Sequence, residues 1–235
     1  VGSEMCIRDS YLIRIPMMSE VPELVRIADG SLNSEVSVIR AISSEAVKAG
    51  KTHNVILMVD VGDLREGVMP EDAVKTAGEV LDLPGVRLEG IGTNLGCYGG
   101  VIATGENMGC LAGLAKDIER RYGIKLATIS GGNSETLQLM REGGLARGVN
   151  QLRVGEAILL GTDSTYASPI LGLEQDTMIL KTEVIESKTK PSVPIGEIGK
   201  NSFGEVPVFE NKGDMRRAIV AVSYTHLTLP TIYSV

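Results

Sequence analysis

The sequence has no cluster of lysine and arginine, and its formal net charge is −7. Nucleic-acid binding relies on clustered basic side chains, so this charge pattern excludes a nucleic-acid partner and favours a small molecule. Cysteine is scarce, and the three cysteines lack paired spacing, which predicts a cytoplasmic protein. No apolar stretch is long enough to cross a bilayer, so we expect no membrane partner. With 43% apolar residues, the 235-residue chain can form one sizeable hydrophobic core.

Both ends of the sequence resemble translated sequencing adapters. Residues 4–10 resemble a transposase mosaic-end adapter, and residues 222–231 resemble the same adapter read on the opposite strand. We therefore interpret residues 1–10 and 222–235 as adapter-like artefacts rather than as ordinary termini. The biological part then runs from about Tyr11 to Ala221, truncated at both ends.

Between these ends, short apolar runs alternate with helix-like segments in about six β/α units. We predict strands at 12–15, 29–33, 55–60, 86–94, 126–130 and 151–153, and helices at 20–28, 34–49, 70–81, 106–122, 133–141 and 156–160. Nearly continuous apolar strands separated by helices indicate a parallel sheet buried on both faces. An open doubly wound sheet and a barrel both fit this pattern. A truncated start favours an incomplete (β/α)8 TIM barrel that lacks its first two strands.

The hydrophobic pattern of the sequence changes after Gly161, where helical periodicity disappears. A strand-like run at 177–186 is followed by a segment rich in proline and glycine, and then by the apolar run 217–221. This pattern predicts the start of a mostly β C-terminal domain. We therefore divide the chain into a partial barrel domain at 11–165 and a partial β domain at 166–221.

Polar residues gather where four of the predicted parallel strands end. The four groups are Asp60 with Arg65, Thr93 with Asn94, residues 130–134, and residues 153–155. The active site of a parallel barrel lies at the carboxyl ends of its strands, so the four groups should meet at one mouth. The alternative for each group alone is an ordinary turn or helix cap.

Two of these groups have the composition of a phosphate-binding site. Gly131 and Gly132 allow the backbone to approach an anion closely, while Asn133 and Ser134 open a helix. Gly155 and Glu156 open the next helix in the same way. Many barrel enzymes bind sugar phosphates at this position. The Glu156 carboxylate would repel a phosphate unless it points away and only its N–H is used.

Four segments together resemble the alanine racemase family. They are residues 59–67, 90–94, 130–134 and 152–155, which occur in the order and spacing of that family. Residues 191–199 are most similar to the ornithine racemase branch. The resemblance implies a barrel that binds pyridoxal 5'-phosphate (PLP) and acts as a homodimeric isomerase. It would racemise a free amino acid, with ornithine or another basic amino acid expected, by removing and returning the Cα proton.

The resemblance also assigns cofactor-binding roles to residues of this sequence. It implies that Ser134 and the backbone N–H groups of Gly155 and Glu156 bind the PLP phosphate. It implies no metal ligand. Acidic side chains near the mouth, Glu156 and Glu197, could meet the terminal ammonium of a basic substrate.

The resemblance gives the two arginines catalytic as well as cofactor-binding roles. Arg153 would face the pyridine nitrogen, and because its guanidinium keeps its charge, it cannot give that nitrogen a proton. Arg65 would lie near the phenolic oxygen of the cofactor, and Asn94 against its ring. The alternative for both arginines is an ordinary salt bridge.

Three features of the sequence depart from the alanine racemase pattern. No lysine ends a barrel strand, and the family's Schiff-base lysine belongs to a first strand that would precede Tyr11. Met58 stands where alanine racemases often have a carbamylated lysine. Ile195 stands where they have the tyrosine that acts as the second base. The second base is therefore unknown, with the Glu197 loop one place to look.

Two other functions fit parts of the sequence. One is a non-catalytic PLP homeostasis protein, although the β segment after residue 177 speaks against it. The other is a barrel enzyme that binds a sugar phosphate without a Schiff base.

We also expect Cys97 and Cys110 to be small packed residues rather than nucleophiles, and His53 to lie on the surface. With unpaired barrel edges, the 235-residue chain should be poorly soluble and inactive.

Overall fold

The computed structural model describes residues 9–163, 165–166, 168–179, 182–201 and 204–220. Contacts divide the chain into two compact units, residues 1–178 and residues 179–235. The adapter-like segments, apart from residues 9 and 10, lie outside the described residues. The division into a barrel domain that ends at residue 165 and a β domain that begins at residue 166 stays a prediction.

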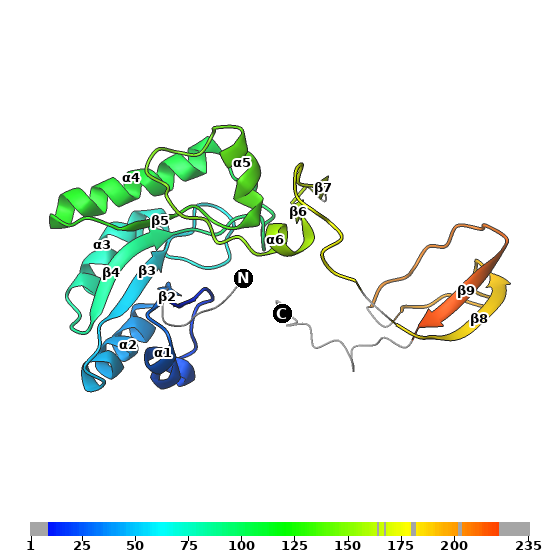
Figure 1. Ribbon diagram of the computed structural model, residues 1–235, viewed down its shortest axis with the longest axis horizontal. Coiled ribbons are helices and arrows are strands. Elements are labelled where there is room, and N and C mark those ends of the chain that lie inside the picture. The colour runs from blue at the N-terminus through cyan, green and yellow to red at the C-terminus, as the bar shows by residue number, and fades with distance from the viewer. Residues whose placement is uncertain (1–8, 164, 167, 180–181, 202–203, 221–235) are drawn as a thin grey trace. The chain divides into compact units, whose positions relative to one another are not determined.

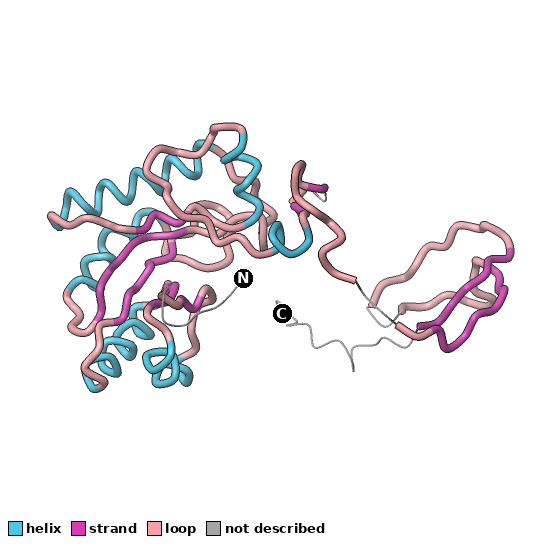
Figure 2. The backbone as a smooth tube through the Cα atoms, in the orientation of Figure 1, coloured by secondary structure: helices cyan, strands magenta, loops and turns pink. Residues whose placement is uncertain are grey.

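The first unit is built on one curled sheet of five parallel strands (Figures 1 and 2). Their spatial order is their order in the chain: β1 (Tyr11–Leu12), β2 (Gly30–Asn33), β3 (His53–Met58), β4 (Val86–Gly92) and β5 (Thr128–Ser130). A doubly wound sheet would reverse its strand order at a switch point, and this sheet does not. The structure therefore confirms the predicted incomplete barrel.

Helices follow the strands along the chain. They are η1 (Met18–Glu20), α1 (Val21–Ile27), α2 (Val36–Lys48), α3 (Pro70–Leu81), α4 (Gly105–Tyr122), η2 (Ser134–Thr136), α5 (Leu137–Arg141) and α6 (Glu156–Leu160). The predicted bounds of α3 and α6 are confirmed. The hydroxyl of Thr104 caps α4 by accepting from Asn107 N at 3.3 Å, and Gly123 ends it with a left-handed φ of 65°.

Apolar side chains of β3 and β4 alternate between two faces of the sheet. Val55, Leu57 and Ile91 belong to the main core, which they share with helices α2, α3 and α4 (Figure 1). Ile56 and Met58 pack with Leu32 in a separate cluster on the interior face of the curled sheet. Because side chains of a strand alternate in direction, apolar side chains cover both faces of these strands. The polar side chains follow at the carboxyl ends of the strands.

The sixth predicted unit is less regular than expected. The predicted strand at 151–153 is reduced to an isolated parallel bridge between Gln151 and Ser130. The reason is that the chain turns from the sheet edge immediately afterwards, where Arg153 N donates to Gly132 O at 2.8 Å. The helix predicted at 133–141 is likewise split into η2 and α5.

The prediction that His53 lies on the surface was wrong. His53 is the first residue of β3 and is only 2% exposed. Its Nε2 lies 2.8 Å from the hydroxyl of Ser31 on the neighbouring strand β2. The strand starts two residues before the apolar run that predicted it, and the hydrogen bond to Ser31 makes burial of the polar ring possible.

The second unit contains one antiparallel pair in its described part, β8 (Val184–Pro191) and β9 (Asp214–Val220). The strand predicted at 177–186 was misplaced, because only its last residues belong to β8. The run 217–221 is confirmed as part of β9 up to Val220, and Ala221 lies outside the described residues. The short pair β6 (Thr162–Asp163) and β7 (Ser168–Pro169) belongs to the first unit. Across the described ranges, no helix is long and apolar enough to span a membrane.

Candidate active site

A closed loop after β3 carries Arg65. Val68 N donates to Met58 O, and Asp60 N donates to Val68 O, each at 2.9 Å, so residues 59–68 return to the strand they left. Gly67 allows this closure, because a Cβ there would lie 2.5 Å from Asp60 N. Leu64 has a positive φ of 54°, which turns the chain just before Arg65.

Two aspartates hold this loop in shape. Asp60 Oδ1 accepts from Gly62 N at 2.8 Å and from Leu64 N at 3.1 Å. Asp63 reaches the loop after β4, where its carboxylate accepts from Tyr98 N at 2.8 Å and from Val101 N at 3.1 Å. Asp60 therefore acts as a turn residue, which was the alternative to a role in the active site.

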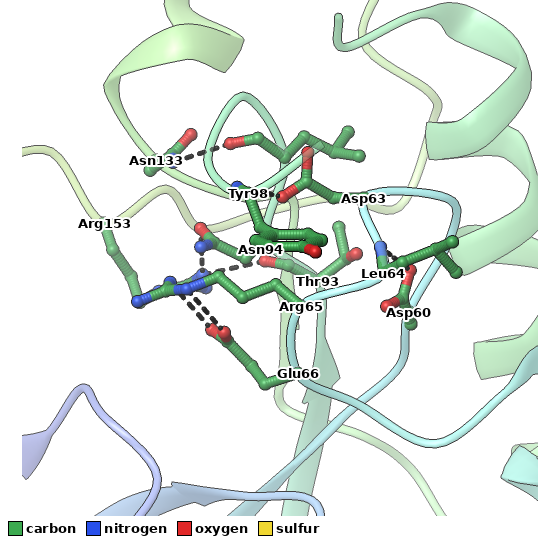
Figure 3. Close-up of polar contacts among 11 residues, drawn as sticks. Asp60, Asp63, Leu64, Arg65, Glu66, Thr93, Asn94, Tyr98, Asn133 and Arg153 are labelled. Carbon is green, nitrogen blue, oxygen red and sulfur yellow. Dashed lines mark hydrogen bonds and ion pairs between the residues drawn. The ribbon is translucent and has the colours of Figure 1, made fainter. Parts of the chain in front are cut away.

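Arg65 pairs with the next residue, Glu66. Arg65 Nε lies 3.1 Å from Glu66 Oε2, and Nη1 lies 3.3 Å from Oε1 (Figure 3). Burial raises the pKa of the Glu66 carboxyl, while the charges of Arg65 and Arg153 oppose that rise. Arg65 was expected at the mouth from the sequence, whereas Glu66 was not.

Arg153 is held by neutral oxygens from two strand ends, of which Figure 3 shows those of Thr93 and Asn94 after β4. Its Nη1 donates to Ser130 Oγ at 2.6 Å, and its Nη2 donates to Thr93 O at 2.7 Å and to Asn94 Oδ1 at 3.4 Å. Burial lowers the pKa of the guanidinium to about 10, so Arg153 remains charged at neutral pH. Within the described part of the chain Arg153 forms no ion pair, so the salt-bridge alternative does not describe it.

Ser134 lies beside this arginine, at the start of η2. The side chain is buried, and its hydroxyl accepts from Gly155 N at 3.3 Å and from Ala157 N at 3.2 Å. The N–H groups of Gly155 and Glu156 were expected beside Ser134, whereas those that contact its hydroxyl belong to Gly155 and Ala157. Glu156 turns its carboxylate to Thr162, which donates from Oγ1 at 2.9 Å. The acidic group is thus directed at a hydroxyl.

The geometry of this mouth suits an anion beside a guanidinium. Gly132 has a positive φ of 112°, and a Cβ added at Gly155 would meet no atom within 4 Å. Open backbone at these positions lets an anionic group approach N–H donors closely. Two buried polar atoms nearby, Thr93 Oγ1 and Asn133 Oδ1, have no hydrogen-bond partner among the residues that the structure describes. Buried atoms of this kind are expected where a ligand completes the hydrogen bonding.

Comparison with known proteins identifies the family. Residues 8–163 match the family model described as alanine racemase, N-terminal domain. The chain belongs to this family. It is 43% identical over 212 residues to the ornithine racemase of Acetoanaerobium sticklandii, and 41% identical over 211 residues to the lysine racemase of Thermotoga maritima. Each match covers 90% of this chain, and 60% and 59% of those relatives.

A solved alanine racemase from Clostridium difficile shares the fold. Its TM-score is 0.55 at 19% identity, over 88% of this chain and 52% of that one. This chain thus spans about 60% of the length of the curated relatives that it matches. The activities of those whole proteins can therefore only be proposed for this chain.

The structure gives the positions of the residues that depart from the alanine racemase pattern. Met58 is fully buried on the interior face, and its Sδ lies near Gly92, where a Cβ would approach it to 3.2 Å. Ile195 is 92% exposed and lies, like Glu197, in the second unit.

Cys97 and Cys110 are exposed, so the expectation that they are packed was wrong.

Proposed function

We propose that the protein is a PLP-dependent amino-acid racemase. The observation that carries the proposal is the Arg153 guanidinium, fixed by Ser130 and Thr93 and separated by one residue from the N–H of Gly155. A cationic group of fixed orientation close to backbone N–H donors suits a cofactor with a ring nitrogen and a phosphate. Family membership and the two racemases at 43% and 41% identity support the same assignment.

Residues of this chain fit the phosphate end of PLP. The Ser134 hydroxyl and the N–H groups of Gly155 and Glu156 would bind it, since each can donate a hydrogen bond to a phosphate oxygen. In the present structure the Ser134 oxygen accepts from two N–H groups, which leaves its own proton free to donate. The Glu156 carboxylate, directed at Thr162, would not repel the phosphate.

Residues of this chain also fit the ring. Arg153 would face the pyridine nitrogen, Asn94 would lie against the ring, and Arg65 would lie near the phenolic oxygen. When bound, PLP withdraws electrons from the Cα of an attached amino acid and so weakens the Cα–H bond. Because Arg153 keeps its proton at neutral pH, it leaves the ring nitrogen unprotonated. That state favours removal and return of the Cα proton over transamination.

We propose a basic amino acid as substrate and a homodimer as the active form. Relatives named ornithine racemase and lysine racemase support a substrate with a terminal ammonium. Of the two glutamates suggested for that ammonium, Glu156 is engaged by Thr162. Glu197 is exposed in the second unit. Isoleucine at position 195 cannot carry a proton, so a different group must act as the second base.

The proposed cofactor can be tested in the full-length gene product. We expect PLP to give an absorption band that borohydride fixes, and peptide mapping to place the label on a lysine. A barrel enzyme for sugar phosphates would bind phosphate but give no such adduct. Binding of PLP without a borohydride-stable adduct would overturn the proposed chemistry.

A further inference from the structure

Glu66 lies where two positively charged side chains of the mouth meet (Figure 3). Its two carboxylate oxygens face Nε and Nη1 of Arg65, at 3.1 Å and 3.3 Å. The Glu66 side chain is 19% exposed and that of Arg65 is 31% exposed. One hydrogen bond and a second short contact between the charged groups restrict the orientation of the guanidinium as well as its position.

The other carboxylates of this loop have different partners. Asp60 accepts from Gly62 N and Leu64 N, and Asp63 accepts from the backbone of Tyr98 and Val101. Both aspartates therefore shape the loop through backbone N–H groups. Glu66 is the carboxylate of this loop that faces the guanidinium of Arg65.

Glu66 also affects Arg153, whose hydrogen-bond acceptors are uncharged. Arg65 and Arg153 lie close enough for the charge of Arg65 to lower the pKa of Arg153, and the charge of Glu66 raises it. Two guanidiniums with one carboxylate leave a single net positive charge. Without the carboxylate, the Glu66 charge would no longer offset the repulsion between the two guanidiniums.

We propose that Glu66 is a positioning residue, which holds the Arg65 guanidinium in a fixed orientation and offsets the combined charge of Arg65 and Arg153. Its use in catalysis rests on the proposed function, because Arg65 is useful there only if a cofactor or substrate meets it. The pairing itself is a property of this chain and can be tested without the cofactor.

A positioning role and a purely structural role predict opposite effects on stability. Burial raises the pKa of Glu66 even though the charges of Arg65 and Arg153 lower it, so the cost of burying the carboxylate outweighs their attraction and folding favours the protonated form. Ionised Glu66 therefore lowers the free energy of unfolding at pH values above that pKa. Replacement by a neutral glutamine should leave the fold at neutral pH as stable as before, or more stable.

Glu119 provides a matched control. Its side chain is 18% exposed, it pairs with Lys125 at 3.0 Å, and it accepts from Leu126 N at 3.0 Å. These contacts lower its pKa, so ionised Glu119 stabilises the fold. Glu119→Gln should lower the free energy of unfolding and leave Arg65 unaffected.

The experiment compares Glu66→Gln, Glu66→Asp and Glu119→Gln with the wild type in the full-length gene product. Phenylglyoxal modification of Arg65, followed by peptide mass mapping, measures how firmly the guanidinium is held. We expect Glu66→Gln to speed modification about threefold or more, as for the loss of an ion pair, and Glu66→Asp to fall between it and the wild type. Urea unfolding should show no loss of stability for Glu66→Gln, and kcat/KM for racemisation should fall about tenfold.

Two results would overturn the proposal. One is an unchanged rate of Arg65 modification in Glu66→Gln. The other is a loss of stability in Glu66→Gln as large as that in Glu119→Gln, which would make Glu66 structural. Failure of the wild type to bind PLP or to racemise would instead defeat the proposed function, and the Arg65 rates would still decide the role of Glu66.

Discussion

Arg153 donates a 2.6 Å hydrogen bond from Nη1 to the hydroxyl of Ser130, which ends strand β5. The same guanidinium reaches the carbonyl of Thr93, just beyond the end of β4. One side chain therefore joins two strand ends at the mouth of the half-barrel. The position of the Gly155 backbone, two residues further along, depends on this connection.

Replacing Arg153 should loosen the mouth as well as remove a charge. Arg153→Met leaves the Thr93 carbonyl and the Ser130 hydroxyl without this donor, so the free energy of unfolding should fall by about 1–3 kcal/mol. Lysine cannot make both contacts from one planar group, so Arg153→Lys should recover only part of the loss. Urea unfolding measures both. A change within experimental error in Arg153→Met would show that these hydrogen bonds do not hold the strand ends.

Ser134→Ala should weaken phosphate binding more than it weakens the fold. The substitution removes an acceptor for two N–H groups and, in the proposed function, a donor to the PLP phosphate, so PLP affinity should fall about tenfold. Ser43→Ala is the matched control, because Ser43 is similarly buried and donates to the carbonyl of Pro84 away from the mouth. Absorption titration with PLP measures both variants. Equal affinities in the two would remove Ser134 from the phosphate site.

Gly67→Ala should disrupt the loop that carries Arg65. A Cβ at this position would lie 2.5 Å from Asp60 N and 2.7 Å from the carbonyl carbon of Val59, in a backbone conformation with φ of 133°. We expect a loss of about 2 kcal/mol or more in the free energy of unfolding. Gly100→Ala is the control, since its φ is also positive but no atom lies within 4 Å, and it should cost about 1 kcal/mol. Equal losses would show that close approach at Gly67 does not matter.

His53 should make stability depend on pH. Burial lowers the pKa of its imidazole below 6.5, so the unfolded chain binds a proton at a higher pH than the native protein does. The free energy of unfolding should therefore fall as the pH drops from about 6.5 toward the lower native value. His53→Asn should reduce this fall. Urea midpoints for both proteins between pH 7 and 5 measure it, and parallel curves would contradict the effect.

Much of the fold could be predicted from the sequence, because strong local signals mark its elements. Pro70 opens α3 and Gly123 ends α4, as their backbone preferences predicted. Elements without such signals were misplaced. The start of β8 was predicted too early, within the run 177–186. Strand β3 begins earlier than its apolar run because Ser31 allows His53 to be buried.

The candidate site was predicted less completely, since its contacts depend on the folded loops. Arg65, Asn94, Ser134 and Arg153 were expected at the mouth, and the structure places them around it. The pairing of Arg65 with Glu66 could not be predicted, because neighbouring side chains in an extended chain point in opposite directions. The positive φ of Leu64 reverses the chain there, and no glycine at that position signals it.

A racemase of this kind must remove and return the Cα proton of its substrate. The most direct test incubates the full-length gene product and PLP with L-ornithine or L-lysine in deuterated water. Chiral chromatography and mass spectrometry then follow both enantiomers. We predict that D-amino acid appears with deuterium at Cα, and that Arg153→Met reduces its rate. A protein that binds PLP yet exchanges no Cα hydrogen of ornithine, lysine or alanine would contradict the account.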